Sequence, residues 1–430
     1  MKRIYYILGI VGVIALAIGI GYFLRYRSGA PSPSSGNAFT GTLPTETTAG
    51  GGSGQNNGNE TSGQGTGTNG QTPTPTISAG QKFGVISQSS AINFYVDAQN
   101  NAILVRPTGQ IIKVSSGNPS VLSSSAIAGL IRADFSYDGK KILAVFGDSS
   151  NPQESVFDID SKSWQPLAQG LLSTTWSPDD YKIAYFSNIN GSSALSLQTL
   201  DISNSKAKAV ELMKLNVQDQ ILDWISPNNI IMSDRGSAFT SGSVWLIDTK
   251  NKTLSQLVNG YSGMESIWSR SAGMGLLLSG NSLTNVGGKL SLTNPEGNVI
   301  NSLTFLTLPS KCTFDTEIQN PTSTVSTSTT ATTTKSAAQK QPPVTVKNYL
   351  YCAVPRDSQK LSVSSLPDDY EKMALFTLDN FYKIDLSSGN VTSVFADLNQ
   401  KLDAKNLGVF NNTLLFINRY DSLVYAISLK

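Results

Sequence analysis

The chain has 430 residues, a formal net charge of +2, and charged side chains at 14% of its positions. That charged fraction lies below the quarter or so that is usual in soluble proteins, and no basic stripe of the kind that binds nucleic acid is present. The sequence contains no histidine, which excludes Ser-His-Asp and Cys-His nucleophilic catalysis and His-ligated metal sites. We therefore expect no cofactor, no bound metal and no nucleic-acid partner.

The N-terminal region carries a run of 21 residues without a charged side chain, Ile4–Leu24, with basic residues on both sides and aromatic residues at both ends. A helix of this length crosses the hydrocarbon core of a bilayer, which is about 30 Å thick. The alternative is a cleaved signal peptide, but its apolar core is shorter and ends in a small-residue cleavage site. The sequence predicts that residues 1–27 are a retained transmembrane signal-anchor. The rest of a single-pass membrane protein would then be extracytoplasmic, at the cell surface or in the periplasm.

Two tracts have the composition of disordered chain. Residues 28–81 consist mainly of Gly, Ser, Thr, Asn, Gln and Pro, and they cannot bury enough apolar surface to offset the entropy of ordering. We interpret this tract as a flexible linker. Residues 320–341 have the same Ser/Thr-rich character and are predicted to be a disordered insertion in the folded region.

The remainder of the chain repeats. An aromatic residue followed by a polar turn occurs at Phe135, Trp176, Trp224 and Trp268, with spacings of 41 to 48 residues, and more weakly at Phe314. Each marker is followed by a nearly continuous apolar strand, such as Lys141–Phe146 or Lys182–Phe186 in the sequence. Repeats of about 40–50 residues with four short strands each are typical of β-propellers.

The strand pattern predicts an all-β propeller of seven four-stranded blades over residues 82–430. We place the first blade at 82–131 and the last at about 400–430. The last blade shows only three clear strands, so the sequence leaves the closure of the ring open.

The aromatic-Ser-Pro-Asp turns before apolar strands resemble the WD-repeat-like units of TolB-type propellers, most clearly at Phe135, Trp176 and Trp224. The resemblance covers most of residues 82–430, but the turn after Trp268 lacks Pro-Asp. It implies a protein-binding scaffold and transfers no ligand, because the N-terminal domain of TolB has no counterpart here.

Cys312 and Cys352 are the two cysteines of the chain, and they fall in the first and second strands expected for the sixth blade. Neighbouring antiparallel strands bring Cβ atoms close enough for a bridge. The alternative is two unrelated buried thiols. We predict a disulfide, because an extracytoplasmic compartment is oxidising.

Binding sites of propellers usually lie where the loops between second and third strands gather. Two such loops, 356–379 and 234–242, mix charged residues with aromatic ones as protein interfaces do. The candidate binding residues in them are Arg356, Asp368, Asp369, Tyr370, Asp234, Arg235 and Phe239.

The acidic residues also allow an enzymatic interpretation. Asp368, Asp369 and Glu371 form a candidate carboxylate group, although a helix that begins after Pro367 explains them as well. The sequence favours a non-enzymatic module that binds protein or glycan at the cell envelope. A carboxylate-dependent hydrolase or lyase, and a structural subunit of an envelope assembly, are the alternatives.

Overall fold

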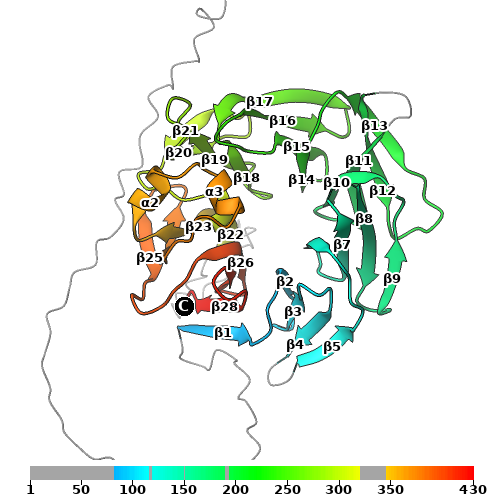
Figure 1. Cartoon of the computed structure of the whole chain (residues 1–430), viewed down its shortest axis with the longest axis horizontal. Coiled ribbons are helices and arrows are strands. Elements are labelled where there is room, and N and C mark those ends of the chain that lie inside the picture. Colours follow the sequence, from blue (N-terminus) through cyan, green and yellow to red (C-terminus); the bar gives the residue numbers. More distant parts are fainter. Residues whose placement is uncertain (1–81, 116–118, 150, 189–192, 320–344) are drawn as a thin grey trace, which may run out of the picture. The chain divides into compact units, whose positions relative to one another are not determined.

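The computed structural model describes residues 82–115, 119–149, 151–188, 193–319 and 345–430. These residues form seven antiparallel sheets of four strands each, arranged in a ring (Figure 1). In each sheet the strands follow one another from the centre of the ring outward. The seven-bladed propeller predicted from the repeats is confirmed.

The first four blades lie in chain order, and each uses four consecutive strands. Their bounds are β2 (Asn93–Val96), β3 (Ala102–Val105), β4 (Ile111–Val114) and β5 (Pro119–Ser123) in blade 1; β6 (Leu130–Phe135), β7 (Lys141–Asp148), β8 (Asn151–Asp158) and β9 (Ser163–Pro166) in blade 2; β10 (Leu171–Trp176), β11 (Lys182–Asn188), β12 (Leu195–Asp201) and β13 (Val210–Leu215) in blade 3; and β14 (Gln220–Ser226), β15 (Asn229–Asp234), β16 (Ser241–Asp248) and β17 (Thr253–Ser262) in blade 4.

The last three blades also contain the described helices. The bounds are β18 (Glu265–Trp268), β19 (Gly275–Gly280), β20 (Gly288–Thr293) and β21 (Val299–Ser302) in blade 5; η1 (Pro309–Lys311), β22 (Cys312–Gln319), β23 (Thr345–Pro355), α2 (Ser358–Ser362), α3 (Asp368–Glu371), β24 (Asp379–Asp385) and β25 (Val391–Phe395) in and before blade 6; and β26 (Ala404–Phe410), β27 (Thr413–Asn418), β28 (Val424–Ser428) and β1 (Phe83–Ser87) in blade 7.

The ring is closed by a strand from the beginning of the described chain. Strand β1 pairs antiparallel with β28, with Phe83 opposite Ile427, and so becomes the outermost strand of blade 7. This corrects the predicted bounds of blade 1, which begins at β2 rather than at residue 82. The C-terminal part of the chain therefore supplies three strands of blade 7, and β1 supplies the fourth.

The hydrophobic core is divided among the junctions between neighbouring blades. Seven clusters of buried apolar side chains each join two successive blades, including blade 7 with blade 1. Between blades 3 and 4, for example, Phe186 packs in one cluster with Trp224 and Met232. The buried middle parts of the second strands, such as Ile142–Val145 in β7, are apolar because both of their faces are covered by a neighbouring blade.

The polar marker turns are built from hydrogen bonds that their sequence provides. Ser136 Oγ donates to Asp138 Oδ1 and Ser177 Oγ donates to Asp179 Oδ1, both at 2.9 Å. Gly139 follows with a positive φ of 72°, and the ring of Tyr95 leaves no space for a Cβ there. These acids have the turn-forming role that the sequence predicts.

Two faces of the propeller follow from the strand directions. We call the face with the connections between second and third strands, and between blades, the loop face, and the opposite one the turn face. Strand β1 begins at Phe83 on the turn face, and β22 ends at Gln319 and β23 begins at Thr345 on that same face. The two longest segments outside the described residues, 1–81 and 320–344, therefore both join the propeller at the turn face.

No helix among the described residues is long and apolar enough to cross a membrane. The predicted anchor 1–27, linker 28–81 and insertion 320–341 lie outside the described residues.

Candidate binding surface

The long loop of blade 6 lies across the loop face and contacts its neighbours on both sides. We call residues 356–378, which include α2 and α3, the cap segment (Figure 1). Its Ser364 carbonyl accepts a hydrogen bond from Gly287 N–H of blade 5 at 2.9 Å. Its Asp368 accepts from Ala238 N–H of blade 4 at 2.7 Å. The cap segment thus joins the two loops that carry the candidate residues into one surface.

Asp368 is the link between those two loops. Besides the bond from Ala238 N–H, its carboxylate accepts from Ser237 Oγ at 3.2 Å. Asp369 has a local role, because its Oδ2 accepts from Ser365 N–H at 2.8 Å and closes the turn before α3. The predicted helix after Pro367 is confirmed by α3.

Arg356 anchors the cap segment to the next connection along the ring. Its guanidinium donates to the carbonyls of Leu398 at 3.2 Å and Gln400 at 2.9 Å, and to Asp397 O, while Nε donates to Asn380 Oδ1 at 3.2 Å. With these partners the side chain holds the loop and has little left to offer a ligand.

Tyr370 lies inside the protein and is only 6% exposed. The guanidinium of Arg419 stacks on its ring at 3.6 Å from the centroid and also donates to its backbone carbonyl at 2.7 Å. Its hydroxyl is 3.1 Å from Asp403 Oδ1. Tyr370 therefore fixes the underside of the cap segment and does not form part of the exposed surface.

Beneath Tyr370 lies a buried network of charges. Lys311 Nζ is 2.7 Å from Asp379 Oδ2 and 2.5 Å from Asp403 Oδ1, and Arg419 Nη1 is 2.9 Å from Asp403 Oδ2. Lys311 and Asp403 have no exposed side-chain surface. Two cations and two anions balance, which is the condition under which charges can be buried.

Pairing decides the pKa directions of Lys311 and Asp403, whereas burial raises the pKa of Asp379 despite its contact with Lys311. Burial opposes the charged form of Lys311, but the attraction of Asp379, together with Tyr370 and Asp403, outweighs it and raises the lysine pKa. Burial likewise opposes the charged form of Asp403, but Lys311 outweighs it and lowers the pKa of that carboxyl. The network joins the starts of β22, β24 and β26 to the end of β27, and so it fixes blade 6 to blade 7 below the cap segment.

The three candidate residues of blade 4 differ in their exposure. Asp234 accepts from Gln220 Nε2 at 2.7 Å and from Ser243 N–H at 2.8 Å, so it organises its own loop. Arg235 forms an exposed ion pair with Asp219 at 3.1 Å. Phe239 is 64% exposed and presents its ring to solvent.

Exposed large apolar side chains occur in the loops of blades 4–7 on the loop face, and Phe239 is one of them. Leu283 in the loop of blade 5 is 91% exposed. Others on this face of blades 5–7 are Val363, Met373, Leu398 and Tyr420. We call these six residues the apolar rim. A set of this size on one face is typical of an interaction site, whereas single exposed apolar residues are ordinary.

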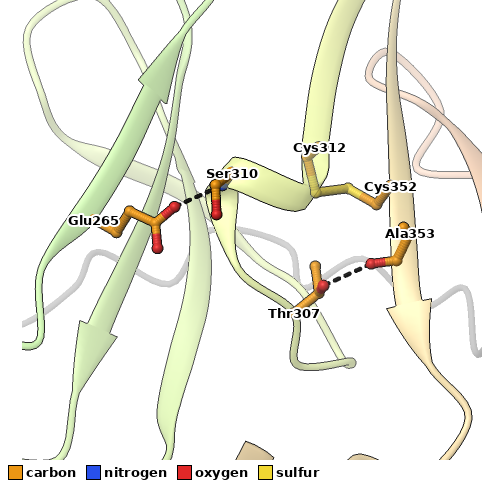
Figure 2. Close-up of a disulfide and its surroundings, with 6 residues drawn as sticks. All are labelled: Glu265, Thr307, Ser310, Cys312, Cys352 and Ala353. Carbon is orange, nitrogen blue, oxygen red and sulfur yellow. Dashed lines mark hydrogen bonds between the residues drawn. A yellow bond between two sulfur atoms is a disulfide. The ribbon is translucent and has the colours of Figure 1, made fainter. Parts of the chain in front are cut away.

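Figure 2 shows how the connection between blades 5 and 6 is held. Cys312 and Cys352 lie opposite each other on β22 and β23, with Cα atoms 4.1 Å apart, and form a disulfide. The predicted disulfide is confirmed. Thr307 Oγ1 donates to Ala353 O at 2.6 Å.

Glu265 is another acid of this region with a raised pKa. It lies at the start of β18, where the innermost strand meets the loop face, and accepts from Ser310 N–H at 2.6 Å (Figure 2). Burial, with a further contribution from the negative charge of Glu371, raises the pKa of Glu265 to about 7. Burial also raises the pKa of Asp134 and of Asp223 on the innermost strands β6 and β14.

Sequence reasoning missed the buried network and Glu265. A lysine in a sequence gives no sign that its side chain is enclosed. The one signal is its place between Pro309 and Cys312, at the entry to a strand.

No family model matches the sequence, and neither does any curated protein sequence. Solved structures with a similar arrangement of strands include a prolyl endopeptidase (12% identity, TM-score 0.45), the β-propeller domain of the Trilobed protease from Pyrococcus furiosus (10%, 0.44) and TolB from Acinetobacter baumannii (11%, 0.32). The matches cover 76%, 81% and 78% of this chain, and 46%, 92% and 62% of the other chains. The chain thus spans less than half of the prolyl endopeptidase. Similarity at this level implies no shared activity, and the fold assignment rests on the seven sheets.

Proposed function

We propose that this protein is a membrane-tethered, extracytoplasmic binding module whose loop face over blades 4–7 contacts a protein partner. The observation that carries the proposal is the apolar rim. Four of its six members are aliphatic side chains or methionine, which suit the apolar core of a protein interface. Glycan recognition would be favoured by stacked aromatic platforms with free polar groups beside them, and this surface offers few of either.

The surface is also organised before any partner arrives. Asp368 fastens the cap segment to blade 4, Arg356 fastens it to the connection after blade 6, and the stacked Tyr370–Arg419 pair holds it from below. A loop that is already ordered loses less conformational entropy on binding, so more of the contact energy appears as affinity.

The tether is proposed from the sequence alone, through the uncharged run Ile4–Leu24. The strand directions are compatible with it, because residue 82 enters the propeller on the turn face and the apolar rim lies on the opposite face. A chain anchored through residues 1–27 would leave the apolar rim accessible to a partner.

Carboxylate catalysis is the second candidate, and Glu265 is the observation that favours it. A carboxyl with a pKa of about 7 at the loop-face end of an innermost strand has the property of a general acid or base at neutral pH. Hydrolysis of a glycan or peptide that is lost in Glu265→Gln would establish this function in place of simple binding.

Site-specific photo-crosslinking tests the binding proposal. A benzophenone amino acid is placed at Leu283 on the loop face and, as a matched control, at Tyr137 on the turn face, which is 40% exposed. In cells that produce the full-length chain, we expect a discrete protein adduct from position 283 and none from 137. Phe239→Asp should abolish the adduct without changing the thermal unfolding temperature. Equal adducts from both positions, or none from the loop face, would contradict the proposal.

A further inference from the structure

A cleft of about 430 Å³ separates the innermost strands of blades 5 and 6. It is distinct from the apolar rim, because part of its wall is the polar turn after β18, on the turn face. Its two ends are held by hydrogen bonds, from Ser310 N–H to Glu265 toward the loop face and between Ser271 Oγ and Thr316 Oγ1 toward the turn face. The lining residues are Ile267, Trp268, Ser269, Arg270, Ser271 and Cys312–Thr316.

Hydrogen bonds also join the innermost strands of blades 1 and 2 and of blades 2 and 3. Asn93 Nδ2 donates to Ala133 O across blades 1 and 2, and Arg132 Nη2 donates to Thr174 O across blades 2 and 3, both at 2.6 Å. Strand β18 has four residues and β22 has eight, so the second half of β22 faces a turn rather than a strand. The cleft is therefore a consequence of a short strand placed beside a long one.

One wall of the cleft is apolar, whereas the rest of its lining is polar or charged and includes Ser269–Ser271 and Asp315. Ile267 and Phe314 pack against the buried cluster that contains the two bonded cysteines. Asp315 points to the other face of the sheet, because it is opposite Tyr349, which belongs to the cluster between blades 6 and 7. Its carboxylate is thus directed away from the apolar wall.

Arg270 is the free charge of the cleft. Its side chain is exposed and forms no hydrogen bond or ion pair with the described residues, although its positive charge partly opposes the burial that raises the pKa of Asp223 in the neighbouring blade. In blade 3 the same position of the marker turn is Pro178, and there the next residue, Asp179, binds the turn serine. In blade 5 that acid is replaced by Ser271, so the turn has lost its own anion and gained a guanidinium.

We propose that this cleft binds a carboxylate joined to an apolar body, and specifically the C-terminal end of a peptide whose last residue is hydrophobic. Arg270 would receive the carboxylate, for which the planar guanidinium is the best-matched side chain. The apolar wall of Ile267 and Phe314 would receive the last side chain. The hydroxyls of Ser271 and Thr316, which bond to each other, border the end of the cleft toward the turn face. A volume of about 430 Å³ is within the usual range for small-ligand sites and accommodates one or two residues.

The probe is the dipeptide N-acetyl-Ala-Phe with a free carboxylate, compared with the same dipeptide as the C-terminal amide. Binding to the full-length chain in detergent is measured by isothermal titration calorimetry at low and high salt. We expect saturable binding of the acid, at least tenfold weaker binding of the amide, and weaker binding of the acid at high salt.

The variants are Arg270→Gln, Arg270→Lys and, as a matched control, Lys140→Gln. Lys140 lies in the corresponding turn of blade 2 on the same face and is 57% exposed, so its replacement removes the same charge without touching the cleft. Arg270→Gln should weaken binding of the dipeptide acid at least tenfold. Arg270→Lys should recover part of that lost affinity, and Lys140→Gln should leave the affinity unchanged. Equal affinity of acid and amide, unchanged binding by Arg270→Gln, or no saturable binding up to about 10 mM acid would overturn the proposal.

Discussion

Replacement of Glu265 by Gln is expected to stabilise the propeller at pH 8.5 and to change its stability little at pH 5. The folded state raises the pKa of Glu265 from 4.5 to about 7, so between these values it binds more protons than the unfolded state. The free energy of unfolding therefore falls as the pH rises through this window. Gln keeps an acceptor oxygen for the Ser310 N–H but carries no charge at any pH.

The size of the effect follows from the shift. Each pKa unit corresponds to 1.36 kcal/mol, so a rise from 4.5 to about 7 is worth at most about 3 kcal/mol, and the partial exposure of Glu265 reduces that figure. We expect the free energy of unfolding of Glu265→Gln, relative to that of the wild type, to rise by about 2 kcal/mol from pH 5 to pH 8.5.

Urea unfolding followed by tryptophan fluorescence measures this difference at several pH values. Glu296→Gln is the control, because Glu296 is exposed in the turn before β21 and a solvated carboxylate loses little water on folding. Its effect should be the same at both ends of the pH range. A Glu265→Gln protein with equal effects at pH 5 and pH 8.5, or with a loss of stability at pH 8.5, would refute the assignment of a buried, proton-retaining carboxyl.

Three further predictions concern the supports of the candidate surface. Asp403→Asn removes the anion between Lys311 and Arg419 and should cost about 3 kcal/mol or more in urea unfolding at pH 7; because the pKa of Asp403 is lowered in the fold, the difference from wild type should shrink as the pH falls below about 4. Replacement of both Cys312 and Cys352 by Ser should cost about 2–5 kcal/mol, and an effect below about 1 kcal/mol would contradict a structural role of the disulfide. Asp368→Ala should release the cap segment from blade 4 and increase amide hydrogen exchange in residues 356–378 with little change in global stability, whereas unchanged exchange would show that the clamp is dispensable.

The blades could be predicted from sequence because each one repeats the same local pattern. An apolar run covered on both faces and preceded by a polar turn, which in blades 2 and 3 has its own Ser–Asp hydrogen bond, is encoded within about ten residues. The disulfide was predictable for a related reason, since the register of two adjacent strands already brings Cys312 and Cys352 together. Seven blades and one bridge thus follow from short-range information.

Ring closure could not be read in the same way. Residues Phe83–Ser87 look like the first strand of blade 1, and only the pairing with β28 shows that they finish blade 7. That pairing joins segments more than three hundred residues apart, and it depends on the geometry of the whole ring rather than on any property of the strand itself.

The buried network was hidden for a different reason. An isolated lysine inside a protein is costly, so Lys311 is expected at the surface unless its partners are known. Its partners Asp379 and Asp403 come from two later connections, and Tyr370 from the cap segment. These residues meet only in the tertiary structure, so the sequence does not show that they are partners. The tertiary structure also changes the meaning of Tyr370, which sequence reasoning places on the binding surface and the structure places beneath it.

The blades that depart from the repeat are also the ones that carry both proposed sites. In blades 2 and 3 the marker turn is closed by its own serine and aspartate, and blade-to-blade contacts are regular. In blade 5 that aspartate is replaced by Ser271, and other interactions hold the sheets of blades 5 and 6 in place: the disulfide, the Glu265–Ser310 hydrogen bond and the Lys311 network. Because these interactions fix the blades, the turn after β18 and the cap segment are not needed to hold the sheets together. The turn is then free to present Arg270, and the cap segment is free to present an apolar surface, without loss of the ring that supports them.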